Sequence, residues 1–373
     1  MPAWIKGGVP HPGHVVQSTA MAVTEPPPIT YRIRLPRRLI ESGALSLLQV
    51  EAALYCMQMH EKRLPTGERA GWMLGDGTGI GKGRILSAIM YENLLRGRDR
   101  AVWVTASPFL ANQIRRDVKD IGLPMRVLEL KDQPLPYNPN LFRLEPGIMI
   151  CTYRTLIRTE KAGNISRMGQ LISWLGGENW DGVLALDEAH LAKNLVPSNR
   201  TLLGGRKPSK TAVTIDKLQS TLRHARVIYA SATIATGPEN LQCLSRLGLW
   251  GPGTAFPDSG LFAKAMKDAG LQGLEMMSIN LKKEGKYVAR TLGFKGCEFQ
   301  IVKAPVDPAF PAMYDACARQ WEKLRKDLQP WKASPQFWLL FWGTHQRFFK
   351  SLYVAAKLPF LLTQAREALA QGY

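Results

Sequence analysis

The sequence lacks paired cysteines. Its five cysteines lie far apart and include no CxxC pair: Cys56, Cys151, Cys243, Cys297 and Cys317. This spacing argues against a disulfide scaffold or a zinc ribbon and favours a reducing compartment. Cys56 and His60 could share a helix face, but two isolated ligands do not make a zinc site. We interpret both as ordinary core or surface residues.

Long apolar runs and biased tails are also missing. The longest apolar run, residues 337–342, is far too short to span a bilayer, and no signal-peptide core is visible near the N-terminus. We therefore expect a soluble intracellular protein without a membrane partner. Because long acidic or low-complexity tails are absent, we favour a bacterial, plasmid or phage origin and a cytoplasmic location. A eukaryotic protein would be expected in the nucleus.

Acidic residues are few for a chain of 373 residues. Asp and Glu number 30 against 49 Lys and Arg, which gives a formal charge of +19. Such a surplus attracts polyanions, of which nucleic acid is the commonest. The alternative is a basic protein without such a partner. Residues 1–43 are rich in proline and arginine and predict an extended basic arm, a candidate nucleic-acid contact.

The middle of the chain alternates short apolar runs with amphipathic segments. The apolar runs at 71–74, 101–107, 147–153, 182–188 and 226–232 are typical of parallel strands buried on both faces. Helical patterns at 44–61, 84–95 and 110–121 lie between or before them. This alternation predicts an α/β fold over 44–250, with helices on both faces of a mainly parallel sheet.

The alternation of apolar runs and amphipathic segments ends near residue 250. Helical patterns at 261–269 and 271–283 precede a long helical region rich in aromatic residues. We expect these aromatics to pack between helices rather than to stack on bases. Residues 251–357 are thus predicted to form a mostly helical extension.

A glycine-rich stretch, "GDGTGIGKGR", follows the first apolar run and precedes a helix. Its five glycines and one lysine are typical of a phosphate-binding loop, in which backbone amides and a helix N-terminus cradle phosphate oxygens. Lys82 would reach the β and γ phosphates of ATP. The candidate ATP-binding residues are Gly75, Asp76, Gly77, Thr78, Gly79, Ile80, Gly81, Lys82, Gly83 and Arg84.

A second motif, "VLALDEAH", ends an apolar strand about a hundred residues later. In P-loop enzymes an acidic residue at this place holds the Mg²⁺ that bridges the β and γ phosphates. We assign Asp187 to the metal and Glu188 to the attacking water as general base. His190 is predicted to sense the nucleotide.

A third motif, "YASATI", ends another apolar strand. The hydroxyls of Ser231 and Thr233 can hydrogen-bond to His190, so we expect Ser231, Ala232 and Thr233 to couple hydrolysis to movement. The three motifs together predict a helicase-type, RecA-like P-loop lobe.

Taken together, "GDGTGIGKGR", "LDEAHLAKN" and "ARVIYASAT" resemble the strawberry notch family of superfamily-two helicase-like ATPases, related to Swi/Snf-type remodellers. The resemblance runs from about residue 11 to the last residue. It implies ATP clamped between two RecA-like lobes that move along duplex nucleic acid, and adenine contacted by Gln49. It also implies nucleic-acid contacts from 105–113 and 152–156, where Ser107, Thr152 and Arg115 can bind phosphates.

Two features depart from a complete motor. Gly83 stands where most P-loops have the Ser or Thr that ligates Mg²⁺, so a water or Thr78 would have to fill that place. In addition, residues 358–373 look like the first helix of a second lobe that is otherwise absent. We therefore expect a truncated motor that binds ATP better than it hydrolyses it, since the second lobe supplies arginine fingers.

Three functions follow from these observations. The leading prediction is an ATP-dependent, nucleic-acid translocase or remodeller that acts on double-stranded DNA. A regulatory module that recruits transcription or chromatin proteins, with ATP as a structural ligand, is the alternative. The net charge opposes the third option, an ATPase that acts on small molecules.

Overall fold

The computed structural model describes residues 2, 4–133, 145–158, 165–195, 208–232, 237, 240–295, 297–331 and 333–372. Two compact units make up the chain, Met1–Lys295 and Gly296–Tyr373. Within the described residues, no helix is long and apolar enough to cross a membrane. The division into four segments that the sequence suggests stays a prediction.

A seven-stranded sheet forms the centre of the first unit, in the order β4-β5-β3-β6-β7-β2-β8. All neighbouring strands in it pair in parallel. Its strands are β2 (Trp72–Leu74), β3 (Arg100–Thr105), β4 (Arg126–Glu129), β5 (Gly147–Thr152), β6 (Val183–Asp187), β7 (Arg226–Ala230) and β8 (Tyr287–Val288). The predicted α/β fold with a mainly parallel sheet is confirmed.

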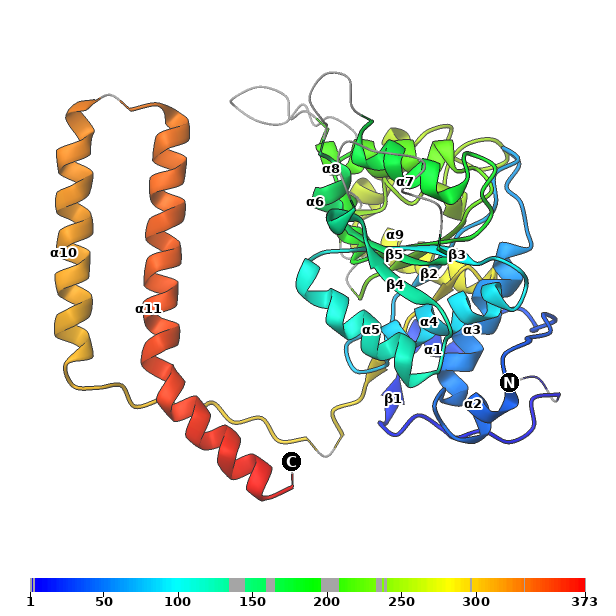
Figure 1. Ribbon diagram of the computed structural model, residues 1–373, viewed down its shortest axis with the longest axis horizontal. Coiled ribbons are helices and arrows are strands. Elements are labelled where there is room, and N and C mark those ends of the chain that lie inside the picture. The colour runs from blue at the N-terminus through cyan, green and yellow to red at the C-terminus, as the bar shows by residue number, and fades with distance from the viewer. Residues whose placement is uncertain are drawn as a thin grey trace. The chain divides into compact units, whose positions relative to one another are not determined.

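Helices cover both faces of this sheet, as the continuous apolar strands require. Figure 1 shows α3, α4 and α5 on one side of the sheet and α7 and α8 on the other. The helices are α3 (Leu47–His60), α4 (Lys82–Leu94), α5 (Ala111–Asp120), α6 (Tyr153–Leu156), α7 (Arg167–Leu175), α8 (Lys210–Thr221) and α9 (Ser259–Lys283). Inside α9, Gly270 has a φ of 62° and separates the two helical segments that the sequence predicts.

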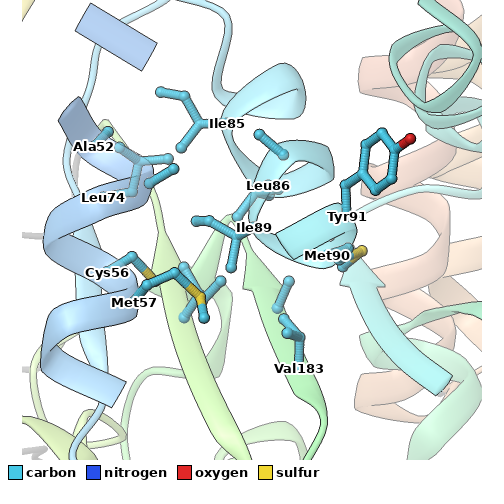
Figure 2. Close-up of a cluster of buried hydrophobic side chains, with 14 of the residues drawn as sticks. Ala52, Cys56, Met57, Leu74, Ile85, Leu86, Ile89, Met90, Tyr91 and Val183 are labelled. Atoms are coloured by element: carbon cyan, nitrogen blue, oxygen red, sulfur yellow. The ribbon is translucent and has the colours of Figure 1, made fainter. Parts of the chain in front are cut away.

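The core beneath α3 and α4 fixes the helix that follows the glycine-rich loop. Figure 2 shows Cys56 and Met57 of α3 and Leu86 and Ile89 of α4 directed toward the strands. All four side chains are fully buried. Burial of a side chain of this size contributes roughly 1.5–3 kcal/mol, so α4 is held firmly against the sheet. Cys56 is therefore a core residue, as expected.

The N-terminal segment packs on this body rather than projecting from it. It contains β1 (Val15–Val16), α1 (Thr19–Val23) and α2 (Arg37–Glu41). β1 pairs antiparallel with β9 (Thr291–Leu292) in a separate two-stranded sheet. β4, β8 and this small sheet are elements that the sequence patterns did not predict.

The second unit consists mainly of two helices, α10 (Phe310–Leu328) and α11 (Pro335–Ala370). Their aromatic side chains meet between the helices: Tyr314 contacts Phe349 with ring centroids 4.9 Å apart, and Trp321 contacts Phe341 at 5.3 Å. Figure 1 shows the two helices side by side. The predicted helical C-terminal extension, with aromatics that pack between helices, is confirmed.

Candidate nucleotide site

The glycine-rich loop joins β2 to α4 and has the backbone of an anion cradle. Gly79 and Gly81 have backbone φ values of 89° and 88°, which residues with a side chain rarely adopt. Gly81 is the N-cap of α4. The first helical hydrogen bond is donated by Ile85 N to Gly81 O. The amides of the first turn, from Lys82 onward, precede this ladder and are available to phosphate oxygens.

Lys82 begins α4 and folds back over the loop. Its Nζ donates to Asp76 O at 3.0 Å and to Gly77 O at 3.4 Å. Ala230 of β7 pairs with Leu74, the residue before the loop, on one side and with Asp187, the last residue of β6, on the other. The loop that leads to Lys82 and the Asp187 carboxylate therefore follow strands that end at the same edge of the sheet, with only β7 between them.

Asp187 is the last residue of β6. Burial raises the pKa of Asp187 to about 6, and the charge of Glu188 adds to the increase. The amide of Glu188 donates to Asp187 Oδ1 at 3.1 Å, and this hydrogen bond partly offsets the increase in the pKa of Asp187. Tyr153, the first residue of α6, donates its Oη to Asp187 O at 2.8 Å, which fixes the strand end.

Glu188, His190 and Ser231 form a cluster beside Asp187. Glu188 has a φ of 51°, an uncommon left-handed conformation for a residue with a side chain. His190 Nδ1 lies 2.9 Å from Ser231 Oγ and 3.2 Å from Glu188 Oε2. The structure thus brings together the predicted base, sensor and coupling hydroxyl. Ala232 is exposed beside them, and Thr233 lies outside the described residues.

Arg290, which no pattern in the sequence indicates, holds the start of the loop. Asp76 is fully buried and accepts three hydrogen bonds from Arg290, which is 3% exposed: from the backbone N and Nε to Oδ1, both at 3.0 Å, and from Nη2 to Oδ2 at 2.6 Å. Gly75 N and Gly77 N donate to Val288 O and Arg290 O, both at 2.7 Å. Gly75, Asp76 and Gly77 therefore anchor the loop, which leaves the segment from Thr78 onward to face a phosphate.

Gln49 supports the loop from α3. Its Nε2 donates to Ile80 O at 3.0 Å, and its Oε1 accepts from Ser46 N at 3.1 Å as part of a capping box. Both ends of the amide are thus in use within the protein. The contact of Gln49 with adenine stays a prediction.

Gly83 has a steric explanation. A Cβ at this position would lie 2.0 Å from Asp117 Oδ2 of α5, so a serine or threonine does not fit unless Asp117 moves. Burial raises the pKa of Asp117. The next residue, Arg84, is turned toward the same helix, and its Nη2 donates to Asp120 Oδ2 at 2.9 Å. Thr78, the suggested substitute for the missing hydroxyl, is exposed on the loop.

The three predicted nucleic-acid contacts have partners within the protein. Ser107 Oγ accepts from Phe109 N at 3.4 Å, and Thr152 Oγ1 accepts from Thr155 N at 3.0 Å. Both hydroxyls cap short helices that follow β3 and β5. Arg115 pairs with Glu129 at 2.6 Å. Their contacts with nucleic acid stay predictions.

These residues fit a magnesium–nucleotide complex. Gly79 and Gly81 give the loop the left-handed turns of an anion cradle, Lys82 supplies the counter-charge, and Asp187 offers one carboxylate. Within the described ranges, no group of three or more His, Cys, Asp or Glu could hold a metal. Mg²⁺ usually takes one or two carboxylates together with phosphate oxygens and water, so a single protein carboxylate suits it.

Known proteins are similar to this chain in sequence over most of its length. The family model of the P-loop containing NTP hydrolase pore-1 matches residues 10–316. Protein strawberry notch homolog of Caenorhabditis elegans is 40% identical over 385 residues, which cover 99% of this chain and 20% of that protein. Protein strawberry notch of Drosophila melanogaster is 39% identical over 389 residues, which cover 100% of this chain and 23% of that protein.

The chain spans less than a quarter of the length of these two relatives. Both are animal proteins and give no support to a bacterial, plasmid or phage origin. Among solved structures, the Sulfolobus solfataricus SWI2/SNF2 ATPase core in complex with dsDNA is 15% identical, with a TM-score of 0.47, over 93% of this chain and 67% of that chain.

Proposed function

Because the chain belongs to the P-loop containing NTP hydrolase pore-1 family, to which its likeness to strawberry notch proteins also points, we propose that it is the ATP-binding lobe of a nucleic-acid-dependent, helicase-like ATPase. The observation that supports this proposal is the register of the sheet, in which Ala230 of β7 lies between Leu74, just before the glycine-rich loop, and Asp187. Lys82 would neutralise the β and γ phosphates, and Asp187 would hold Mg²⁺. When bound, the metal draws charge from the phosphates during hydrolysis.

Glu188 is proposed as the general base. Its carboxylate follows Asp187 on the strained backbone described above and contacts His190. The His190–Ser231 hydrogen bond would pass the state of the nucleotide to the end of β7. A second lobe is proposed to complete the site with cationic side chains, since arginine fingers are worth about 10³–10⁵ in rate in related phosphoryl transfer.

Nucleic-acid dependence is proposed from charge. The surplus of 19 positive charges favours a polyanionic partner, and double-stranded DNA is the proposed one. ATP hydrolysis by a longer version of the protein that includes a second lobe should therefore increase when duplex DNA is added. A longer version whose hydrolysis is the same with and without DNA would remove the motor from consideration.

The site itself is tested by nucleotide binding. We expect Lys82→Ala to abolish binding of a fluorescent ATP analogue, while Lys217→Ala, which removes an exposed cation on α8, leaves it unchanged. Asp187→Asn should remove the Mg²⁺-dependent part of the affinity. Glu188→Gln should bind ATP as the wild type does but fail to hydrolyse it in the longer protein. Unaltered affinity in Lys82→Ala would exclude the proposed role of that residue.

A further inference from the structure

A rigid row of arginines lies on the outer side of α3 and α4, in the segment "TYRIRLPRR" of residues 30–38. Gln58 of α3 fixes its beginning, since Gln58 Oε1 accepts from Thr30 N at 2.7 Å and from Tyr31 N at 3.2 Å. Leu35 and Leu39 are buried against the core. The segment is therefore part of the folded body and not a loose arm.

One buried carboxylate holds the segment in place. Glu92 of α4 is fully buried and accepts four hydrogen bonds: from Tyr31 Oη at 2.9 Å, Arg34 N at 2.7 Å, Leu35 N at 3.0 Å and Arg96 Nε at 2.9 Å. Its oxygens are occupied by two backbone amides, a phenol and Arg96. The Glu92 carboxylate thus orders the segment without pairing with the guanidinium groups that the segment exposes.

Four arginines of this segment, which we call the arginine strip, face solvent: Arg32, Arg34, Arg37 and Arg38. Within the part of the chain that the structure describes, none of them forms an ion pair. Arg32 lies over the ring of Trp4 at 4.9 Å, and Arg34 Nη1 donates to Leu95 O at 3.4 Å. By contrast, Arg84, Arg98 and Arg115 of the same unit are each paired with a carboxylate.

The strip extends away from the nucleotide site. α4 begins beside the loop at Lys82 and has 13 residues, a length of about 20 Å. Arg34 contacts Leu95, which follows the far end of that helix. Ala44, a few residues after the strip, accepts a hydrogen bond from Arg84 at the near end. The strip therefore follows the helical layer and does not lie at the carboxyl edge of the sheet, where Ser107, Thr152 and Asp187 are found.

We propose that the arginine strip is a second binding surface for the phosphate backbone of double-stranded DNA, separate from the ATP-site edge. This inference rests on the proposed nucleic-acid dependence and adds where the duplex is held. Guanidinium groups bind phosphate oxygens with two parallel hydrogen bonds. Since Glu92 and Gln58 already order the backbone, binding loses little conformational entropy.

The salt dependence of DNA affinity tests the proposal. Removal of one arginine that neutralises a phosphate should lower the log–log slope by about 0.9, so Arg37→Gln with Arg38→Gln should lower it by about 1.8. At low salt the affinity for a duplex of random sequence should fall on the order of tenfold or more. The control variant, Lys264→Gln with Lys267→Gln, removes two exposed cations from α9 and should retain the wild-type slope.

The variant Glu92→Gln distinguishes two explanations of DNA affinity, the ordered strip and the net charge of the protein. Removal of a negative charge should strengthen DNA binding if charge alone matters. The strip predicts the opposite, a weaker affinity, because the amide has a single acceptor oxygen. It can serve either Arg34 N and Leu35 N or Tyr31 Oη and Arg96 Nε, but not both pairs, so the segment is held less firmly. Thermal unfolding of each variant shows whether it is folded, and the exposed pair Arg37 and Arg38 remains informative if Glu92→Gln does not fold.

The outcomes separate the two proposals. A wild-type protein without salt-dependent DNA binding overturns both the strip and the nucleic-acid part of the proposed function. If the wild type binds DNA and the Arg37 and Arg38 variant keeps its slope and affinity, the strip is wrong and the proposed function stands. A decrease in slope confined to that variant, with nucleotide affinity unchanged, supports the strip.

Discussion

The buried pair of Asp76 and Arg290 gives the sharpest test of how the nucleotide loop is built. Arg290→Met keeps the length and apolar stem of the side chain but removes the guanidinium. The Asp76 carboxylate, which has no exposed surface, would lose two of its three hydrogen bonds and its counter-charge. Removal of one partner of a buried ion pair costs about 3–5 kcal/mol.

That cost is a large fraction of the total free energy of unfolding. Domains of this size unfold with about 5–15 kcal/mol, so Arg290→Met should be markedly less stable than the wild type. Arg290 Nη1 also donates to Leu48 O at 2.9 Å and pairs with Glu51 at 3.2 Å, both on α3. Its removal should therefore loosen the packing of α3 against the loop and weaken nucleotide binding.

The assay is a double-mutant cycle by urea unfolding, with Arg290→Met, Asp76→Asn and the double variant. The double variant leaves no buried charge without a partner, so it should be more stable than the sum of the single changes predicts. A coupling of more than about 1 kcal/mol is expected. If Arg290→Met costs less than about 1 kcal/mol, or if the single changes simply add, the pair does not hold the loop.

Three further predictions concern the core, the loop and the strand end beside it. Burial lowers the pKa of His60 to about 3 from the ordinary 6.5, because the core disfavours the charged imidazolium. Below pH 6.5 the unfolded chain takes up a proton on His60 that the folded protein does not, so the free energy of unfolding decreases as the pH falls from 6.5 toward 3. By pH 5 this loss should be about 2 kcal/mol. Urea unfolding at pH 7.5 and 5 should show this loss in the wild type, and an equal loss in His60→Gln would contradict it. Gly83→Ser should cost about 1–3 kcal/mol by overpacking against Asp117, and Asp117→Ala should recover most of that cost in thermal unfolding; a full penalty in the double variant would mean that the obstacle lies elsewhere. Tyr153→Phe removes the hydrogen bond to Asp187 O and should cost about 0.5–1.5 kcal/mol; unchanged stability would show that the strand end is fixed by other contacts.

Much of the first unit could be predicted from the sequence because its signals are local. The apolar runs of β2, β3, β5, β6 and β7 and the glycines before α4 are each visible within a few residues. Asp187 and Lys82 could be placed together because the carboxyl ends of parallel strands meet at one edge. β4 and β8 are the two edge strands of the sheet. β4 begins with Arg126 and ends with Glu129, neither of which is buried, so it lacks a continuous apolar run, and β8 has only two residues.

The contacts that complete the site could not be predicted in the same way. Arg290 reaches Asp76 from 214 positions away, and no local pattern marks an arginine as the partner of one particular carboxylate. The conflict between Gly83 and Asp117 depends on how α4 and α5 cross, which a sequence pattern does not give. The arginine strip is a second example. Its arginines are visible in the sequence, but nothing in the sequence identifies the buried carboxylate of Glu92 as the group that orders them.

The distance along the chain between Asp76 and Arg290 also bears on biosynthesis. A ribosome that adds about 5–20 residues per second needs on the order of 10–40 s to travel from the codon of one to that of the other. During this interval the emerging loop lacks the strand that flanks it and the cation that neutralises its acid. Nucleotide capture should accordingly begin only after the nascent polypeptide has passed residue 290, so it follows the synthesis of all the strands of the sheet.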